Sequence, residues 1–173
     1  DEIHQVVTLG IHHEKQHQEL LFTDIKYILG HNPLLPRYSQ TFEEHDLEKQ
    51  KQKWLRVNKG LYDIGHNGHE FCFDNELKAH KVHLIPYKIS NKLVTNAEYL
   101  EFMGSGGYDN VELWHAEGWD WKKREGIRSP LYWHWHKNRW KHYTLKGYKE
   151  IDPESPVYHI SYYEAAAFAG WQD

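Results

Sequence analysis

The chain has 173 residues, of which 39% are hydrophobic and 27% are charged. These proportions suit one ordinary domain or parts of two, and they exclude a disordered tail. No apolar run is long enough for an ordinary transmembrane helix, and a net charge of −4 argues against a strongly basic nucleic-acid-binding protein. We therefore expect neither a membrane nor a nucleic acid as a partner. The single cysteine, Cys72, excludes an internal disulfide and fits a reducing compartment, so we expect the cytoplasm.

Residues 3–29 carry the pattern of one long helix. Apolar and small residues recur at spacings of three and four along this range, and Gly30 with the following Pro33 provides a stop. A lone amphipathic helix cannot bury its own apolar stripe. We therefore expect partner helices upstream of Asp1, so that the chain would be a fragment of a longer protein.

After this helix the sequence changes character, and we place a domain boundary near residue 40. The stretch at 43–53 is charged and polar, and the residues beyond it predict short strands joined by long loops. The segment 108–153 contains six tryptophans without a clear period, so we expect irregular structure with short strands there. The remaining predicted elements are strands at 54–57, 60–65 and 82–89, a helix at 95–103 capped by Thr95 or Asn96, and a last helix opened by a Ser161–Glu164 capping box.

The strongest local signal for chemistry is a pair of histidines on the first predicted helix. His13 and His17 are four residues apart, which places both imidazoles on one helix face. One metal ion can take two nitrogen ligands from this spacing, but a usable site needs a third ligand from a neighbouring helix. Since the chain has 15 histidines, the spacing alone leaves open a merely polar, exposed face. His12 points about 100° away from His13 and has no histidine four residues away.

The same segment has the form His-Glu-x-x-His, which in zinc peptidases makes the glutamate a general base. The residues that follow His17 match no extended peptidase pattern, so we do not favour this interpretation. Glu19 lies two residues beyond His17, roughly 200° around the helix. It is therefore better placed to support the structure than to bind the same metal.

Motifs along nearly the whole chain resemble the sulfoxide synthases of ergothioneine biosynthesis (the EgtB type). Residues 11–26 resemble the last metal-binding helix of that family. The other motifs follow in the family's order: Phe71–Glu76, Leu93–Tyr99, Gly106–Tyr108, Leu113–Trp114, Gly118–Trp119, Pro130–Trp133 and Pro156–Ala165.

This resemblance implies an α+β chain that joins parts of two domains. Residues 1–40 would be the C-terminal helix of a DinB-like four-helix bundle, and residues 41–173 the first part of a C-type-lectin-like domain of the formylglycine-generating-enzyme type. It further implies an iron(II) ion held by three histidines between the domains. The implied substrates are O2, hercynine and a cysteine-type thiol, whose sulfur is joined to the imidazole C2 and oxidised to a sulfoxide.

The resemblance also assigns roles to individual residues. His13 and His17 would be two of the three iron ligands, Gln16 would help to hold the substrate imidazole, and Glu19 would support the site from outside the ligand set. The third histidine is expected upstream of Asp1, and the catalytic tyrosine beyond Asp173. The chain alone is therefore expected to be inactive.

Other interpretations remain open at this point. An ovothiol- or selenoneine-type relative would share the architecture, and nothing in these residues separates the branches. A non-catalytic lectin-like binding module would predict no iron dependence and no effect of losing both histidines. A DinB-type thiol transferase would explain only residues 1–30. Formylglycine-generating activity is not favoured because it uses two cysteines and this chain has one.

Overall fold

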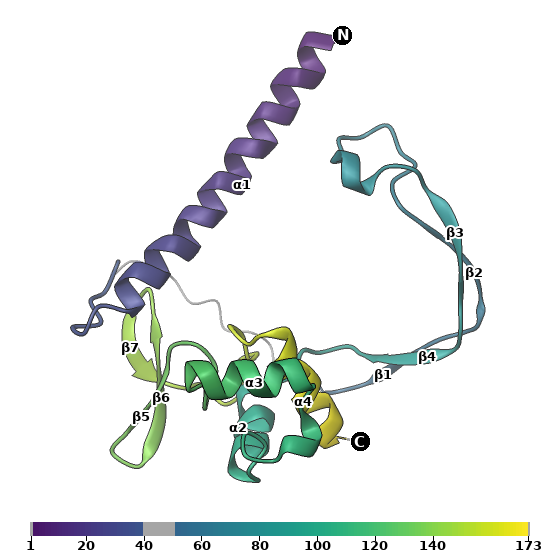
Figure 1. The fold of residues 1–173 in the computed structure, drawn as a ribbon. Helices are drawn as coiled ribbons and strands as arrows, with labels where there is room; N and C mark the ends of the chain where they lie inside the picture. The colour runs from purple at the N-terminus through teal and green to yellow at the C-terminus, as the bar shows by residue number, and fades with distance from the viewer. Residues whose placement is uncertain (1, 40–50, 173) are drawn as a thin grey trace. The chain divides into compact units, whose positions relative to one another are not determined.

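The computed structural model describes residues 2–39 and 51–172, which fall into two compact units. The described part of the first unit is 2–25 and 51–92, and that of the second unit is 26–39 and 93–172. Both contain helical residues and small antiparallel sheets, so the chain has the expected α+β composition (Figure 1). The predicted boundary near residue 40 and most of the charged stretch at 43–53 lie outside the described residues.

The first element, α1 (Glu2–Gly30), is the long helix that the apolar spacing predicts. Between Glu2 and Asp24 every residue is exposed except Thr8 and His12, which are half-buried. Gly30 is the only buried residue of the helix, and a Cβ there would lie 2.8 Å from the ring of Tyr132. The last turn of the helix, which belongs to the second unit, therefore packs against aromatic side chains of that same unit, and residues 2–24 are largely exposed.

The rest of the first unit is a two-stranded antiparallel ribbon (Figure 1). The pattern predicted one strand over 82–89, and this is wrong because Pro86 divides it. Proline fixes its backbone angle φ and has no N–H to donate to a strand ladder. The pairs are β1 (Trp54–Val57) with β4 (Tyr87–Ser90), and β2 (Gly60–Ile64) with β3 (His80–Leu84).

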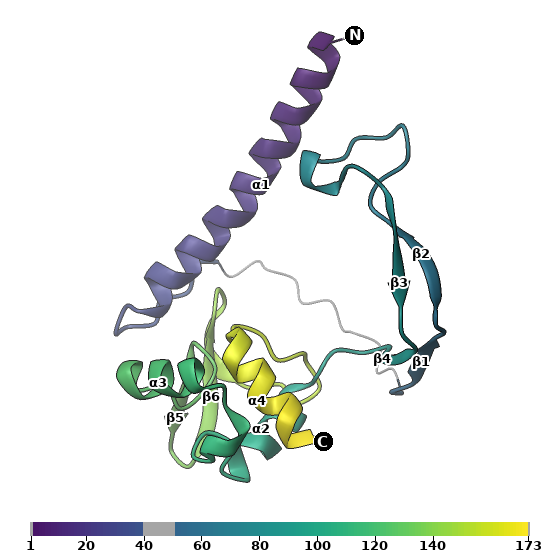
Figure 2. The same ribbon diagram turned by 45° about the vertical axis from the view of Figure 1, so that its right-hand side comes forward.

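The second unit combines three helices with a three-stranded antiparallel sheet in the order β5-β6-β7. Figures 1 and 2 both show α2 and α4 side by side, and they share the core. The elements are α2 (Asn96–Gly104), α3 (Ala116–Glu125), β5 (Trp133–His136), β6 (Arg139–Thr144), β7 (Gly147–Glu150) and α4 (Tyr162–Gln172).

Both predicted helix caps are present. The Thr95 hydroxyl accepts from the Glu98 amide at 3.3 Å, and the Glu98 carboxylate accepts from the Thr95 amide at 2.7 Å. At α4 the Ser161 hydroxyl accepts from the Glu164 amide at 3.2 Å, and the Glu164 carboxylate accepts from the Ser161 amide at 2.7 Å. Each reciprocal pair satisfies two amides that the first turn of a helix leaves without partners.

The expectation of irregular structure over 108–153 is wrong in one important respect, because it missed the helix α3. The residues that α3 buries are Gly118 and Lys122, one turn apart, and neither belongs to an apolar stripe. Gly118 lies under Tyr163, whose ring atoms would be 2.6 Å from an added Cβ, and the Lys122 ammonium lies 4.7 Å from the ring centroid of Trp119. A search for apolar periodicity cannot detect such a helix.

An aromatic cluster forms the core of the second unit. Tyr99 and Phe102 of α2 are fully buried and pack against Phe168 of α4, with ring centroids 5.5 Å and 5.8 Å away. The buried hydroxyl of Tyr108 donates to the Glu164 carboxylate at 2.6 Å. Glu164 therefore serves both the core and the cap of α4.

Candidate metal centre

His13 and His17 lie on one face of α1, and their imidazoles are close together. The two Nε2 atoms are 3.2 Å apart, and the ring centroids are 4.4 Å apart. Two nitrogens that each lie about 2.1 Å from one ion, at an angle of about 100° to one another, are separated by about 3.2 Å. The side chains thus already have the separation that two adjacent ligand positions of one metal ion require.

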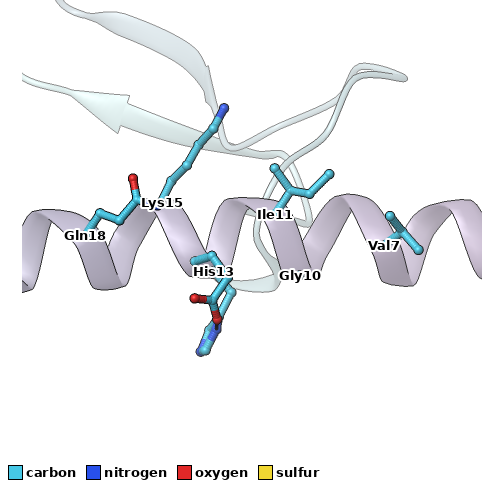
Figure 3. A pocket seen from close by; sticks show the side chains of 7 residues that line it. Val7, Gly10, Ile11, His13, Lys15 and Gln18 are labelled. Atoms are coloured by element: carbon cyan, nitrogen blue, oxygen red, sulfur yellow. Dashed lines mark ion pairs between the residues drawn. The ribbon is translucent and has the colours of Figure 1, made fainter.

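The neighbouring Glu14 provides His13 with a carboxylate partner. Its Oε1 lies 3.6 Å from Nδ1 of His13. This separation is longer than a hydrogen bond, but a carboxylate on this side of the ring electrostatically favours a proton on Nδ1, which suits Nε2 to metal binding. The sequence pattern had suggested Glu14 only as a peptidase base. Figure 3 shows the His13 side chain projecting from the opposite side of α1 to Lys15 and Ile11.

The other two predicted site residues are on the same stretch of helix. Gln16 and Glu19 are both exposed. Within the described part of the chain, the Glu19 carboxylate contacts neither histidine, and its backbone carbonyl accepts from Thr23. The structure therefore brings His13 and His17 together, with Gln16 exposed one position from them and Glu19 exposed on a different side of the helix.

Residues 2–39 and 51–172 contain no group of three or more His, Cys, Asp or Glu side chains that could hold a metal ion. The described part of the chain thus brings together two candidate ligands, both from one helix. A shallow hollow along α1 between Val7 and Gln18 includes His13, and every residue that lines it belongs to this helix (Figure 3). A closed site would need a further element over this surface.

His12, next to the pair, has aromatic partners in the loop between β2 and β3. Its ring stacks on that of Phe71 with centroids 4.0 Å apart and planes 6° apart. The Phe73 ring is roughly perpendicular to the His12 ring, with centroids 6.4 Å apart and an angle of 77° between the planes. The sequence pattern gave no partner for His12, because a contact between segments so distant in sequence leaves no local signal.

A second cluster of titratable groups lies in the second unit, around the end of α1. The Lys26 ammonium donates to Nε2 of His159 at 2.7 Å and lies 4.6 Å from the ring centroid of Tyr158 and 5.1 Å from that of Tyr132. The pKa of His159 is lowered to about 4, chiefly by burial and further by the charges of Lys26 and His142. Burial also lowers the pKa of Lys26 to about 8.

Comparison with known proteins assigns most of the chain to a family. The model of the sulfatase-modifying factor enzyme 1-like domain matches residues 39–173. The chain belongs to this family. Sulfatase-modifying factor enzyme 1-like domains have a C-type-lectin-like fold, which agrees with the helices and small antiparallel sheets of the second unit. The fold that the EgtB-type motifs implied for this region is thereby confirmed.

Curated relatives extend the similarity to α1. A protein named hercynine oxygenase from Mycobacterium tuberculosis is 31% identical over 167 residues, which is 96% of this chain and 38% of that protein. Hercynine oxygenases from Mycolicibacterium smegmatis and Mycolicibacterium thermoresistibile are 37% and 36% identical over 57% and 58% of this chain. The chain therefore spans well under half the length of the curated relatives it matches. In its described part, none of the helices is both long and apolar enough to cross a membrane.

Proposed function

We propose that this chain is part of a non-haem iron(II), O2-dependent sulfoxide synthase that acts on hercynine and a cysteine-type thiol in ergothioneine biosynthesis. The observation that carries the proposal is the His13–His17 pair, with its Nε2 atoms 3.2 Å apart. The support beside it is the 31% identity to a protein named hercynine oxygenase over 96% of the chain. We further propose that the enzyme works in the cytoplasm, in keeping with the single cysteine.

In this proposal His13 and His17 hold the iron through their Nε2 atoms, and Glu14 keeps the proton of His13 on Nδ1. The third histidine comes from another helix of a DinB-like bundle, to which residues 1–40 belong, while residues 41–173 form the lectin-like part. The exposed apolar side chains of α1 support a helical partner, and they include Val6, Leu20 and Leu21. When bound, iron(II) with open positions would supply the redox chemistry for O2 and keep the thiol sulfur deprotonated.

Gln16 is suited to holding the substrate imidazole. Its amide both donates and accepts hydrogen bonds, so it can bind either nitrogen of an imidazole ring. It precedes His17 directly, one position around the helix from the ligand face. Glu19 lies on a different side of the helix, and we propose that it supports the site through a neighbouring element.

The proposed reaction balances with O2 as the oxidant. The C2–H bond of hercynine and the S–H bond of the thiol are lost, and a C–S bond forms between the two substrates. One oxygen atom is bound by the sulfur, and the other leaves as water with the two hydrogens. The protein must therefore hold imidazole and sulfur within reach of one another during the reaction.

The test is anaerobic iron(II) titration of the protein at its natural length, followed by an assay for the sulfoxide with hercynine, cysteine or γ-glutamylcysteine, and O2. Product should require iron, and His13→Ala and His17→Ala should each lower iron affinity by more than about 100-fold. His4→Ala, which removes an exposed histidine from the same helix, is the control.

Two outcomes would contradict the proposal. Wild-type protein that binds no iron, or alanine variants that behave like wild type, would favour a lectin-like binding module. Product formation only with an ovothiol-type acceptor or a selenium donor would move the chain to that branch of the family.

A further inference from the structure

His12 is distinguished from its neighbours on α1 by its burial. From Leu9 to Asp24 it is the only residue that is not exposed, and Thr8, one turn before it, is the other half-buried residue of this part of the helix. Residues four apart share a helix face. The loop between β2 and β3 contributes the stack on His12, so this loop covers one narrow face of α1.

The loop that contacts His12 is held by its own hydrogen bonds. The Phe73 amide donates to the Glu76 carboxylate at 2.8 Å, and the Glu76 amide donates to the Phe73 carbonyl at 3.0 Å. The Glu76 carbonyl accepts in turn from the His66 amide at 2.7 Å. These bonds close a 3₁₀ turn, Asp74–Glu76, directly after the two phenylalanines.

The two phenylalanines, Phe71 and Phe73, form an aromatic clamp around the imidazole. Their own centroids are 5.0 Å apart, with planes at 80°. The Phe71 ring therefore stacks on the His12 ring and the Phe73 ring forms a T-shaped pair with it, two types of arrangement that occur between aromatic rings. The motif Phe71–Glu76 thus has a physical explanation: its aromatic residues contact His12, and Glu76 fixes the backbone of Phe73.

The position of His12 connects this clamp to the metal pair. His12 and His13 are adjacent on a helix, so their side chains leave it about 100° apart. A ring fixed in the clamp consequently fixes the rotation of α1 about its own axis relative to the loop, while the faces of His13 and His17 stay exposed.

We propose that His12 is a positioning residue for the metal ligands, held by the aromatic clamp of Phe71 and Phe73. This inference rests on the proposed function of His13 and His17. The clamp sets the direction in which the two Nε2 atoms point, so that they meet the remaining ligand and the substrates with the right geometry. The loop contributes to the reaction through His12 and does not contact the reacting atoms.

The experiment compares His12→Ala, Phe71→Ala and His12→Phe with wild type and with the control His4→Ala, all at natural length. His12→Phe keeps a flat ring in the clamp and removes the nitrogens. Cobalt(II) replaces iron in the binding measurement, because its absorption bands report ligand geometry. Nuclear magnetic resonance of the His12 ring protons reports the stack itself, since a ring held over Phe71 is shifted upfield.

The two alanine variants should weaken cobalt binding about 10- to 100-fold, alter the cobalt bands and lower kcat more than they change KM. His12→Phe should restore affinity and kcat to near wild type. In Phe71→Ala, the His12 proton shifts should move to those of an exposed histidine such as His4.

Several results would overturn the inference. Folded His12→Ala with unchanged cobalt affinity, bands and kcat, beside an active wild type, would overturn it and leave the proposed function standing. An equal loss of cobalt affinity and kcat in His12→Phe and His12→Ala would show that the clamp does not act through a stacked ring. A wild type that binds neither cobalt nor iron would overturn the proposed function together with this inference.

Discussion

Acidification should destabilise the second unit through His159, and the effect can be worked out from its contacts. In the folded chain the imidazole accepts from the Lys26 ammonium at 2.7 Å, which requires the neutral form. Its pKa is about 4 in the folded chain, against 6.5 without these neighbours. The unfolded chain therefore binds a proton at a higher pH than the folded chain does. The contribution of neutral His159 to the free energy of unfolding is fully present above pH 6.5 and is lost as the pH falls towards 4.

The magnitude follows from the difference in pKa. A difference of one in pKa corresponds to about 1.4 kcal/mol. The difference between the unfolded and folded pKa of His159 therefore limits its contribution to the free energy of unfolding to about 3.4 kcal/mol. His159 is only half-buried, and solvent screening reduces this to about 1–2 kcal/mol. Between pH 7.5 and pH 5 the contribution should therefore be about 1 kcal/mol.

The variant His159→Asn isolates this contribution. His159 has a positive φ of 61°, a conformation that asparagine tolerates better than most residues. The asparagine amide is polar but cannot take up a proton, so the variant removes the titration of this position. Urea unfolding followed by circular dichroism at pH 7.5 and 5.0 should show a midpoint shift about 0.5 M larger in wild type than in the variant. His4→Asn is the matched control, and equal shifts in wild type and His159→Asn would refute the reasoning.

Two further predictions concern the core of the second unit. Gly107→Ala should lower the free energy of unfolding by about 2–3 kcal/mol, because the added Cβ would overlap the buried ring of Phe102. The control Gly104→Ala, where an added Cβ meets nothing within 4 Å, should leave the urea midpoint unchanged, and equal midpoints for the two variants would contradict the prediction. Glu164→Gln should lower the free energy of unfolding by about 1–3 kcal/mol in the same assay, because one accepting carboxylate oxygen becomes an amide nitrogen that donates. A urea midpoint equal to that of wild type would show that the buried acceptor for Tyr108 is dispensable.

The elements that the sequence predicted well are those fixed by neighbouring residues. The caps at Thr95 and Ser161 depend on a residue three positions away, and α1 follows from a period that repeats over the whole helix. The helix α3 was missed because its buried face consists of Gly118 and Lys122, whose packing depends on Tyr163 and Trp119. Tyr163 belongs to α4 and meets Gly118 only in the tertiary structure, and a helix whose buried residues are a glycine and a lysine shows no apolar period.

The candidate site likewise has one feature that local sequence predicts and one that it does not. The approach of His13 to His17 follows from helix geometry once four residues separate them, so the spacing alone was informative. The stack of His12 on Phe71 depends on a loop that the chain reaches only after two strands, and no pattern around His12 indicates it. Whether the two histidines bind iron stays a prediction, because the described residues contain no third ligand with them.

The helix α1 has to serve several neighbours with one set of side chains. The proposed metal ligands, His13 and His17, occupy one face and His12 is stacked in the clamp on the next, while Val6, Leu20 and Leu21 are exposed and apolar. Burying such side chains contributes about 25 cal/mol per Å² of apolar surface, and the helical partner that we propose would gain this contribution. Because each feature lies on a different face, a substitution can remove one of them without changing the side chains of the others. The effect of the clamp on His13 and His17 can therefore be measured with both histidines still in place.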